Sequence, residues 1–299
     1  CTMKRHKICK IIFAILAVFL CVAFYELIGI CITYKKQPAV SDATIKETQN
    51  IMSVAGRENT ERAVIIEKNS QALLERVRLI QNAKDEIILS TFAFKSDESG
   101  KLILGALHDA ADRGVHVRIL VDGMESWIDM EGNPYFYGLS SHENVEIKLY
   151  NKANPLKPWK TMGRMHDKYL IADGKIYILG GRNTYNYFLG DFPGHKNFDR
   201  DVLVVCDEPQ KDNSVNQLWN YFETIWEQED CRYFHNSKKL ADRQSVKKAV
   251  LELQEGYQQY FEVNKEKICD TDYAAETFET EKITLLSNPI HTQAKEPVV

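Results

Sequence analysis

The sequence predicts an α/β fold, with a mixed, largely parallel sheet flanked by helices after an N-terminal transmembrane helix. Between residues 69 and 149, stretches with helical spacing of apolar residues alternate with short β-prone runs. Asp173-Gly174 separates two further apolar runs, which is typical of a two-residue β-hairpin. Residues 11–34 are almost entirely apolar, with Glu26 as the single charge, and are long enough to cross a bilayer.

Residues 1–36 form a basic flank and membrane anchor, with the span at about residues 11–34. Four bases precede the span and two follow it, so the positive-inside rule puts the N-terminus in the cytoplasm. A cleaved signal peptide is the alternative, but no clear small-x-small cleavage site follows the apolar core. We therefore expect a single-pass protein of the cell membrane, with its catalytic domain on the extracytoplasmic side.

The composition is that of a globular protein, with 44% hydrophobic and 27% charged residues in 299. Outside residues 1–36 the chain holds 32 basic and 41 acidic residues. An acidic body is a poor electrostatic match for a polyphosphate backbone, which disfavours nucleic acid as a partner.

The seven cysteines form no CxxC pair and no cluster with metal-ligand spacing. Cys206 and Cys231 either form a disulfide or are two ordinary semi-buried thiols, and the sequence leaves both alternatives open.

The elements predicted after the anchor begin with a linker, residues 37–63, that contains a short helix after Ser41. A helix follows, capped by Asn69 or Ser70, and a second helix follows Ser99. The catalytic lobe covers residues 64–230, a helical connector 231–282, and the start of a second lobe 283–299. The expected strands and the last helix of the lobe are residues 87–92, 115–121, 145–149, 168–172, 175–179 and 197–205, and residues 217–226.

The stretch from Arg164 to Asn183 carries the chemistry. It fits the pattern HxKxxxxD followed after six residues by GGxN, formed by His166, Lys168, Asp173, Gly180, Gly181 and Asn183. On an extended segment, the imidazole and the ammonium two residues apart point to the same side, roughly 6–7 Å apart. This spacing suits one tetrahedral phosphate.

Each residue of the pattern has an expected role. His166 is the candidate nucleophile and Lys168 the group that neutralises charge on the phosphoryl oxygens. Gly181 offers a backbone amide and Asn183 a side-chain donor to the same phosphate. Asp173 is the weakest of the candidate catalytic residues, because Asp before Gly is also what a hairpin turn requires. We expect no metal and no cofactor.

This stretch resembles the HKD signature of the phospholipase D superfamily and looks closest to bacterial cardiolipin synthases, in which RMHxK and GGRNxxxxYF occur in this order. The chain has Asn186 where those relatives usually carry an acid before the Tyr-Phe pair. The resemblance covers roughly residues 64–230 and implies that Asp199 orients the catalytic histidine. It also implies that Phe222 and Trp226 lie on the helix that closes the lobe.

The superfamily builds its active site from two such motifs, in one chain or across a homodimer, and the second histidine acts as general acid. His195, His235 and His291 lack a lysine two residues later, so this chain holds one motif. The final segment resembles the opening of a second repeat. We expect the second motif to come from a missing C-terminal half or from a second subunit.

Three functions remain open. The first is a membrane-anchored phosphatidyltransferase, similar to a cardiolipin synthase, that acts on phospholipid through a phosphohistidine intermediate. The second is a homodimeric phosphodiesterase or nuclease of the same superfamily. The third is a non-catalytic, membrane-tethered protein that binds phosphate.

Overall fold

A computed structural model describes residues 2–35, 41–53, 61–152, 154–160, 163–209 and 213–287. The predicted helix after Ser41 is present, but part of the linker and His291 lie outside the described residues. The helices in this part of the chain are α1 (Thr2–Lys35), α2 (Asp42–Ser53), α3 (Asn69–Asn82), α4 (Glu98–Asp112), α5 (Gly123–Asp129), α6 (Pro134–Ser140), the 3-10 helix η1 (Pro158–Lys160), α7 (Ser214–Trp226), α8 (Lys238–Ala241), α9 (Gln244–Cys269) and α10 (Tyr273–Glu276).

The strands form one sheet in the order β8-β4-β3-β2-β5-β6-β7-β1-β9. Their bounds are β1 Glu61–Ile66, β2 Glu86–Thr91, β3 His116–Asp122, β4 Val145–Tyr150, β5 Lys168–Ala172, β6 Ile176–Gly180, β7 Asp201–Cys206, β8 Cys231–Tyr233 and β9 Phe278–Glu279. The α/β class and the mixed sheet are confirmed, but only β2–β3 and β3–β4 among the described pairings are parallel. The sheet is thus less parallel than expected, because β5, β6 and β7 follow one another as an antiparallel meander.

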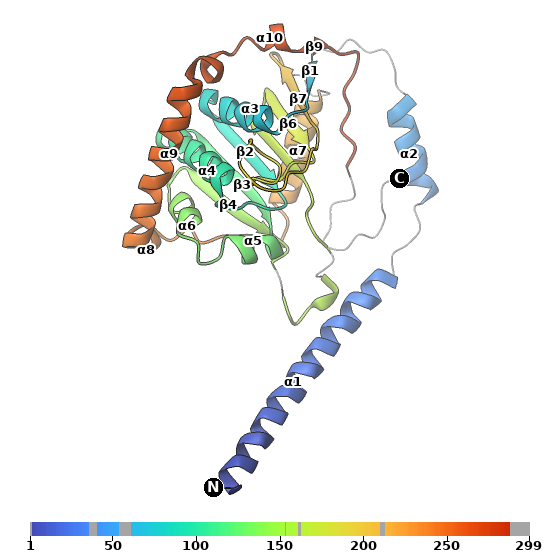
Figure 1. The fold of residues 1–299 in the computed structure, drawn as a ribbon. Helices are drawn as coiled ribbons and strands as arrows, with labels where there is room; N and C mark the ends of the chain where they lie inside the picture. The colour runs from blue at the N-terminus through green and yellow to red at the C-terminus, as the bar shows by residue number, and fades with distance from the viewer. Residues whose placement is uncertain are drawn as a thin grey trace.

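Helices cover both faces of the sheet, as Figure 1 shows, with α3, α4 and α9 on one face and α7 on the other. Alternate residues of each strand enter the two cores: Ile87 and Leu89 face the first core, while Ile88 faces the α7 side. Phe222 and Trp226 are buried on α7 with ring centroids 5.2 Å apart, where the sequence placed them. The sheet is therefore packed against helices on both of its faces.

Two predictions about local structure are wrong. The N-cap of α3 is Lys68, because the Asn69 side chain is used in tertiary contacts: it donates to Asn197 O and accepts from Arg182 Nε. The strand β1 was missed, since its apolar run is too short for periodicity to separate strand from helix.

Cys206 and Cys231 are both buried thiols that form no disulfide, so the thiol alternative holds. They lie on β7 and β8, with β4, β3, β2, β5 and β6 between them in the sheet. Six strand spacings amount to roughly 29 Å, far beyond the reach of a disulfide.

The helix α1 contains a stretch, His6–Ile32, that is long and apolar enough to cross a membrane, with a mean hydropathy of 2.7. Most of this stretch is exposed, and Gly29, near its C-terminal end, is buried against Pro158. Figure 1 shows α1 extending away from the body and meeting it near η1. An N-terminal apolar helix of this kind indicates membrane anchoring.

Candidate active site

One edge of the sheet collects the residues that the sequence singled out. The parallel strands β2 and β3 end there, at Thr91 and Asp122, and the antiparallel strand β5 begins there, at Lys168 opposite Thr91. At the same edge β6 ends at Gly180, opposite the first residue of β7. Loops at the carboxyl ends of parallel strands are where α/β proteins commonly place their sites.

The segment of residues 163–167, which carries His166 into β5, is anchored by the end of β3. Asp122 is buried, and its carboxylate accepts from Arg164 Nε at 2.9 Å and from Met165 N at 3.1 Å. Arg164 also donates to Glu125 at 3.1 Å. The charged hydrogen bonds of Asp122 therefore hold the backbone just before the candidate nucleophile.

Phe92, one residue beyond β2, is the platform of the site. Its ring lies 4.6 Å from the imidazole of His166, centroid to centroid. The guanidinium of Arg164 lies 4.9 Å from the same ring centre and the ammonium of Lys168 lies 5.1 Å from it. Cation–π contacts of this kind orient positive groups against a flat apolar surface. Phe92 thus brings the three basic side chains of the segment to one point.

The imidazole of His166 is exposed to solvent. Its pKa lies below the ordinary value, first because its surroundings desolvate the ring and then because Lys168 carries a like charge nearby. The ring is therefore neutral at neutral pH, which is the form that can attack phosphorus.

Lys168 is buried, and its ammonium donates to His166 O at 2.6 Å. Burial lowers the pKa of this ammonium to about 8, although the carboxylates of Asp167, Asp199 and Asp122 oppose the shift. Lys168 is thus a cation held close to the nucleophile, and its charge is lost as the pH rises through about 8. In the described residues no group of three or more His, Cys, Asp or Glu side chains could hold a metal ion.

Gly181 leaves room for a close approach. A Cβ on this residue would lie 2.1 Å from the Asp199 carboxylate, so a side chain here would displace that carboxylate. Its amide donates to Arg200 O at 3.3 Å, so the backbone donor expected for phosphate is already engaged. Gly181 therefore seats Asp199 against the end of β6 rather than offering a free amide.

Asn183 is buried beside the platform, and its Oδ1 accepts from Ala93 N at 3.2 Å. Within the described part of the chain, no partner is assigned to its Nδ2, which leaves an amide donor next to the Phe92 backbone. This placement is compatible with phosphate binding.

Asp199 lies close enough for its charge to act on Lys168. Its own hydrogen bond is to Arg200 N, at 2.8 Å, and no bond to His166 occurs among the described residues. The orienting role of Asp199 stays a prediction.

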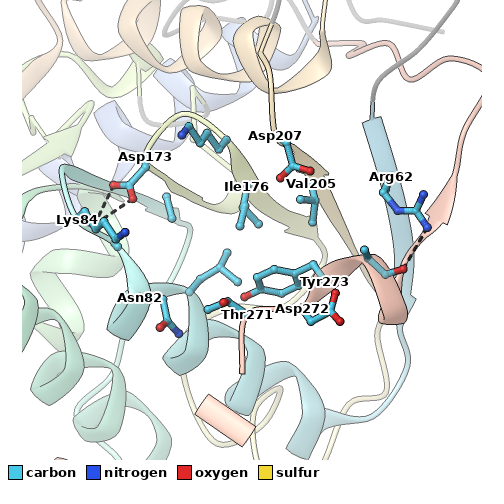
Figure 2. A pocket seen from close by; sticks show the side chains of 15 residues that line it. Arg62, Asn82, Lys84, Asp173, Ile176, Val205, Asp207, Thr271, Asp272 and Tyr273 are labelled. Carbon is cyan, nitrogen blue, oxygen red and sulfur yellow. Dashed lines mark hydrogen bonds between the residues drawn. The ribbon is translucent and has the colours of Figure 1, made fainter. Parts of the chain in front are cut away.

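The structure separates Asp173 from the other residues of the motif. Asp173 follows the last residue of β5, roughly 17 Å along the strand from Lys168. It has φ 51°, and its carboxylate accepts from the backbone amides of Lys84, Asp85 and Glu86 at 3.0, 2.8 and 3.0 Å. Figure 2 shows it facing Lys84 beside a cavity of about 470 Å³. The assignment of Asp173 to the catalytic residues is corrected: it closes the hairpin and holds the start of β2.

Replacing Asp173 tests this assignment. Asp173→Ala should lower the free energy of unfolding by about 2 kcal/mol, because three backbone amides lose an acceptor and the positive φ strains alanine. Asp173→Asn, which tolerates that φ and keeps one acceptor oxygen, should cost less. Urea unfolding followed by circular dichroism measures both, and kcat of the folded variants should stay within a few-fold of wild type. A collapse of kcat in a fully stable Asp173→Asn protein would restore the catalytic role.

Sequence reasoning assigned no part in the site to Phe92, Asp122 or Arg182. Arg182 is fully buried, and it pairs with Asp201 at 3.2 Å while donating to the carbonyls of Ile66 and Glu67. It therefore ties the end of β1 to the start of β7 beneath Asn183. The signal for the other two was their position at the carboxyl ends of predicted strands, where site residues gather: Phe92 ends the strand predicted at 87–92 and Asp122 follows the one at 115–121.

Fold and site together define a phospholipase D-like domain. The family model described as "Cardiolipin synthase, PLD-like domain" matches residues 77–226, half of the chain, and the chain belongs to this family.

The relatives and solved structures are similar over part of their lengths. An uncharacterized protein of Helicobacter pylori is 33% identical over 181 residues, which are 56% of this chain and 35% of that protein. Cardiolipin synthase C of Escherichia coli is 29% identical over 154 residues, 47% of this chain and 31% of that enzyme. The chain thus spans about a third of the length of these relatives. A crystal structure of phosphatidylserine synthase from Haemophilus influenzae shares the fold, with a TM-score of 0.50 at 16% identity over 73% of this chain and 48% of that one.

Proposed function

We propose that this chain carries one half of the active site of a membrane-anchored phosphatidyltransferase, similar to a cardiolipin synthase. The observation that carries the proposal is the neutral, exposed imidazole of His166 beside the buried ammonium of Lys168 on the Phe92 platform. A nucleophile and a cation at one point suit attack on a phosphodiester.

The reaction has two displacements. A ring nitrogen of His166 attacks phosphorus, the first alcohol leaves, and a phosphatidyl group remains on the histidine. An acceptor alcohol, or water in competition with it, then displaces the histidine. Lys168 neutralises the charge that develops on the phosphoryl oxygens, and the Nδ2 of Asn183 donates to the same group.

The departing alkoxide needs a proton, and a second histidine would supply it as general acid. In the described residues no other histidine lies two positions before a lysine. We propose that the second motif comes from chain beyond residue 299 or from a second subunit. Asp199 is our candidate for orienting His166, since it is seated at the same edge of the sheet.

Phospholipid is favoured over nucleic acid by three observations. The family takes its name from cardiolipin synthase, the apolar helix α1 would hold the domain at a bilayer, and the chain beyond residue 36 has more acids than bases. We propose the extracytoplasmic side of the cell membrane for the domain, because the bases are concentrated before the span.

Covalent trapping tests the proposal. The protein in membranes of its own cell is incubated with phosphatidylglycerol labelled at phosphorus and quenched in alkali, in which phosphohistidine survives. We expect label on His166 and a product with two phosphatidyl groups or, with water, phosphatidic acid. Labelled oligonucleotide run in parallel should give no adduct. If neither donor labels the protein, the non-catalytic alternative replaces this proposal, and label from the oligonucleotide alone would establish the nuclease.

A further inference from the structure

Large apolar side chains are exposed around the edge of the sheet that carries His166. We call them the rim; they are between 39% and 82% exposed, and they are Trp127, Ile128, Leu156, Trp159 and Phe198. Exposed residues of this size are costly in water when they gather, and they often mark a surface that is covered in use.

The fold brings the rim together from three segments. Trp127 and Ile128 lie on α5, which begins directly after β3 ends. Leu156 and Trp159 lie in residues 154–160, shortly after β4 ends, and Phe198 comes shortly before β7 begins. These three strand ends lie at the edge where β5 starts. The rim therefore lies at the same end of the sheet as the candidate active site.

Basic residues lie between the apolar ones. A small hollow beside α5 is lined by Lys152, Lys157, Lys160 and Arg164, together with Met124 and two asparagines. Lys152 and Lys157 are exposed, whereas Lys160 is paired with Asp230 at 2.9 Å. Apolar side chains with lysines beside them match a membrane surface with anionic headgroups.

The helix α1 touches the same segment. Tyr25 donates its hydroxyl proton to Leu156 O at 3.1 Å. Pro158 packs so closely on Gly29 that a Cβ there would lie 2.5 Å from Pro158 Cγ. Figure 1 shows α1 meeting the body at η1, on the side where α5 lies.

These contacts set the depth of the rim. Tyr25 and Gly29 both belong to the apolar stretch His6–Ile32. Its 27 residues measure about 40 Å as a helix, against about 30 Å of hydrocarbon, so a centred span puts Gly29 at the boundary of the hydrocarbon. The segment of residues 156–159 then lies at the same boundary, where tryptophan is favoured.

We propose that the rim rests on the surface of an anionic bilayer, with Leu156 and Trp159 at the boundary between headgroups and acyl chains. The edge that carries His166 then faces the lipid surface, so a phospholipid headgroup reaches the imidazole while its acyl chains stay in the bilayer. This inference rests on the proposed lipid substrate and adds a second membrane contact to the anchor.

Tryptophan fluorescence tests the proposal, because the four tryptophans form two pairs. Trp127 and Trp159 lie on the rim, while Trp219 and Trp226 lie on α7 against the sheet. The full chain is inserted into phosphatidylcholine vesicles that contain phosphatidylglycerol and acyl chains brominated near the headgroup, since bromine quenches only at close range. Quenching should persist in W219F/W226F and be mostly lost in W127F/W159F. Equal quenching in the two variants, or loss of quenching in W219F/W226F, would overturn the proposal.

Charge variants provide the matched control. Lys152→Glu with Lys157→Glu should reduce the quenching of the rim tryptophans in anionic vesicles. Lys175→Glu with Lys265→Glu, which changes two exposed lysines away from the rim, should leave it unchanged. The same reduction in both pairs would show that net charge, not the rim, drives contact.

The outcome is independent of catalysis. His166→Ala should be quenched as strongly as wild type, because quenching reports position alone. Rim contact without covalent label would leave this inference standing and reject the proposed function. Covalent label without rim contact would reject this inference and leave the proposed function standing.

Discussion

His166→Ala is expected to abolish covalent labelling and to lower kcat/KM by at least about 10⁴-fold, since removal of a nucleophile leaves only the binding and charge stabilisation of the site. The fold should survive, because the imidazole is exposed and its main contact is the face of Phe92. Rates of product formation from phosphatidylglycerol, measured with wild type and variant at equal folded concentration, check the result.

His195, in the loop between β6 and β7, provides the control. His195 is exposed, lies next to Lys196 and packs against Tyr187 with ring centroids 5.3 Å apart. His195→Ala should change kcat/KM by no more than a few-fold, because it removes a similar ring outside the motif. Equal losses in the two variants would mean that neither histidine is the specific nucleophile.

The order of elements in the lobe was predictable because periodicity is a local property. The hairpin at Asp173-Gly174 is the clearest case: the strand Lys168–Ala172 was placed to the residue, and both turn residues have positive φ. The direction of pairing was less predictable. The chain alone does not show that β2 lies between β3 and β5, so the antiparallel share of the sheet was underestimated.

For the site as well, local features were predictable and contacts between distant segments were not. His166 and Lys168 were singled out as candidates because they lie two residues apart in one segment, and spacing of that kind is visible in a single sequence. Phe92 and Asp122 come from strands far away in the chain, and their contacts with the segment depend on the register of the sheet.

Asp173 shows that residues close in sequence can lie far apart in the fold. It lies five residues from Lys168 in sequence, but an extended strand carries it to the other edge of the sheet. Membership of one motif therefore does not imply membership of one site.

The activity should fall as pH rises through about 8, because the Lys168 ammonium has its pKa lowered to about 8 and loses the charge that stabilises the transition state. The pKa of His166 is also lowered, so the nucleophile stays neutral at neutral pH and the acidic limb lies below its ordinary value of 6.5. A profile of kcat/KM against pH should be bell-shaped, with its alkaline limb near pH 8.

Two variants test whether Lys168 is the group that causes the alkaline limb of the pH profile. Lys168→Arg keeps a charge at all accessible pH, so its alkaline limb should disappear even if its rate is lower. Lys168→Met should reduce kcat/KM by about 10²–10³-fold at neutral pH, which is the typical effect of removing one charge-stabilising group. It should lack the alkaline limb as well. An alkaline limb near pH 8 that persists in Lys168→Met would assign the titration to another group.

The free energy of unfolding should rise with pH over the range in which the activity falls. Burial makes the protonated form of Lys168 unfavourable in the folded state, so its pKa is below the value of 10.5 that it has when unfolded. Between about pH 8 and 10.5 the unfolded chain binds more protons than the folded one, and the free energy of unfolding rises with pH through this group. The difference between wild type and Lys168→Met in urea unfolding isolates its contribution. A wild type that gains no stability relative to Lys168→Met across this range would contradict the lowered pKa, and with it the view that burial of Lys168 sets the alkaline limit of catalysis.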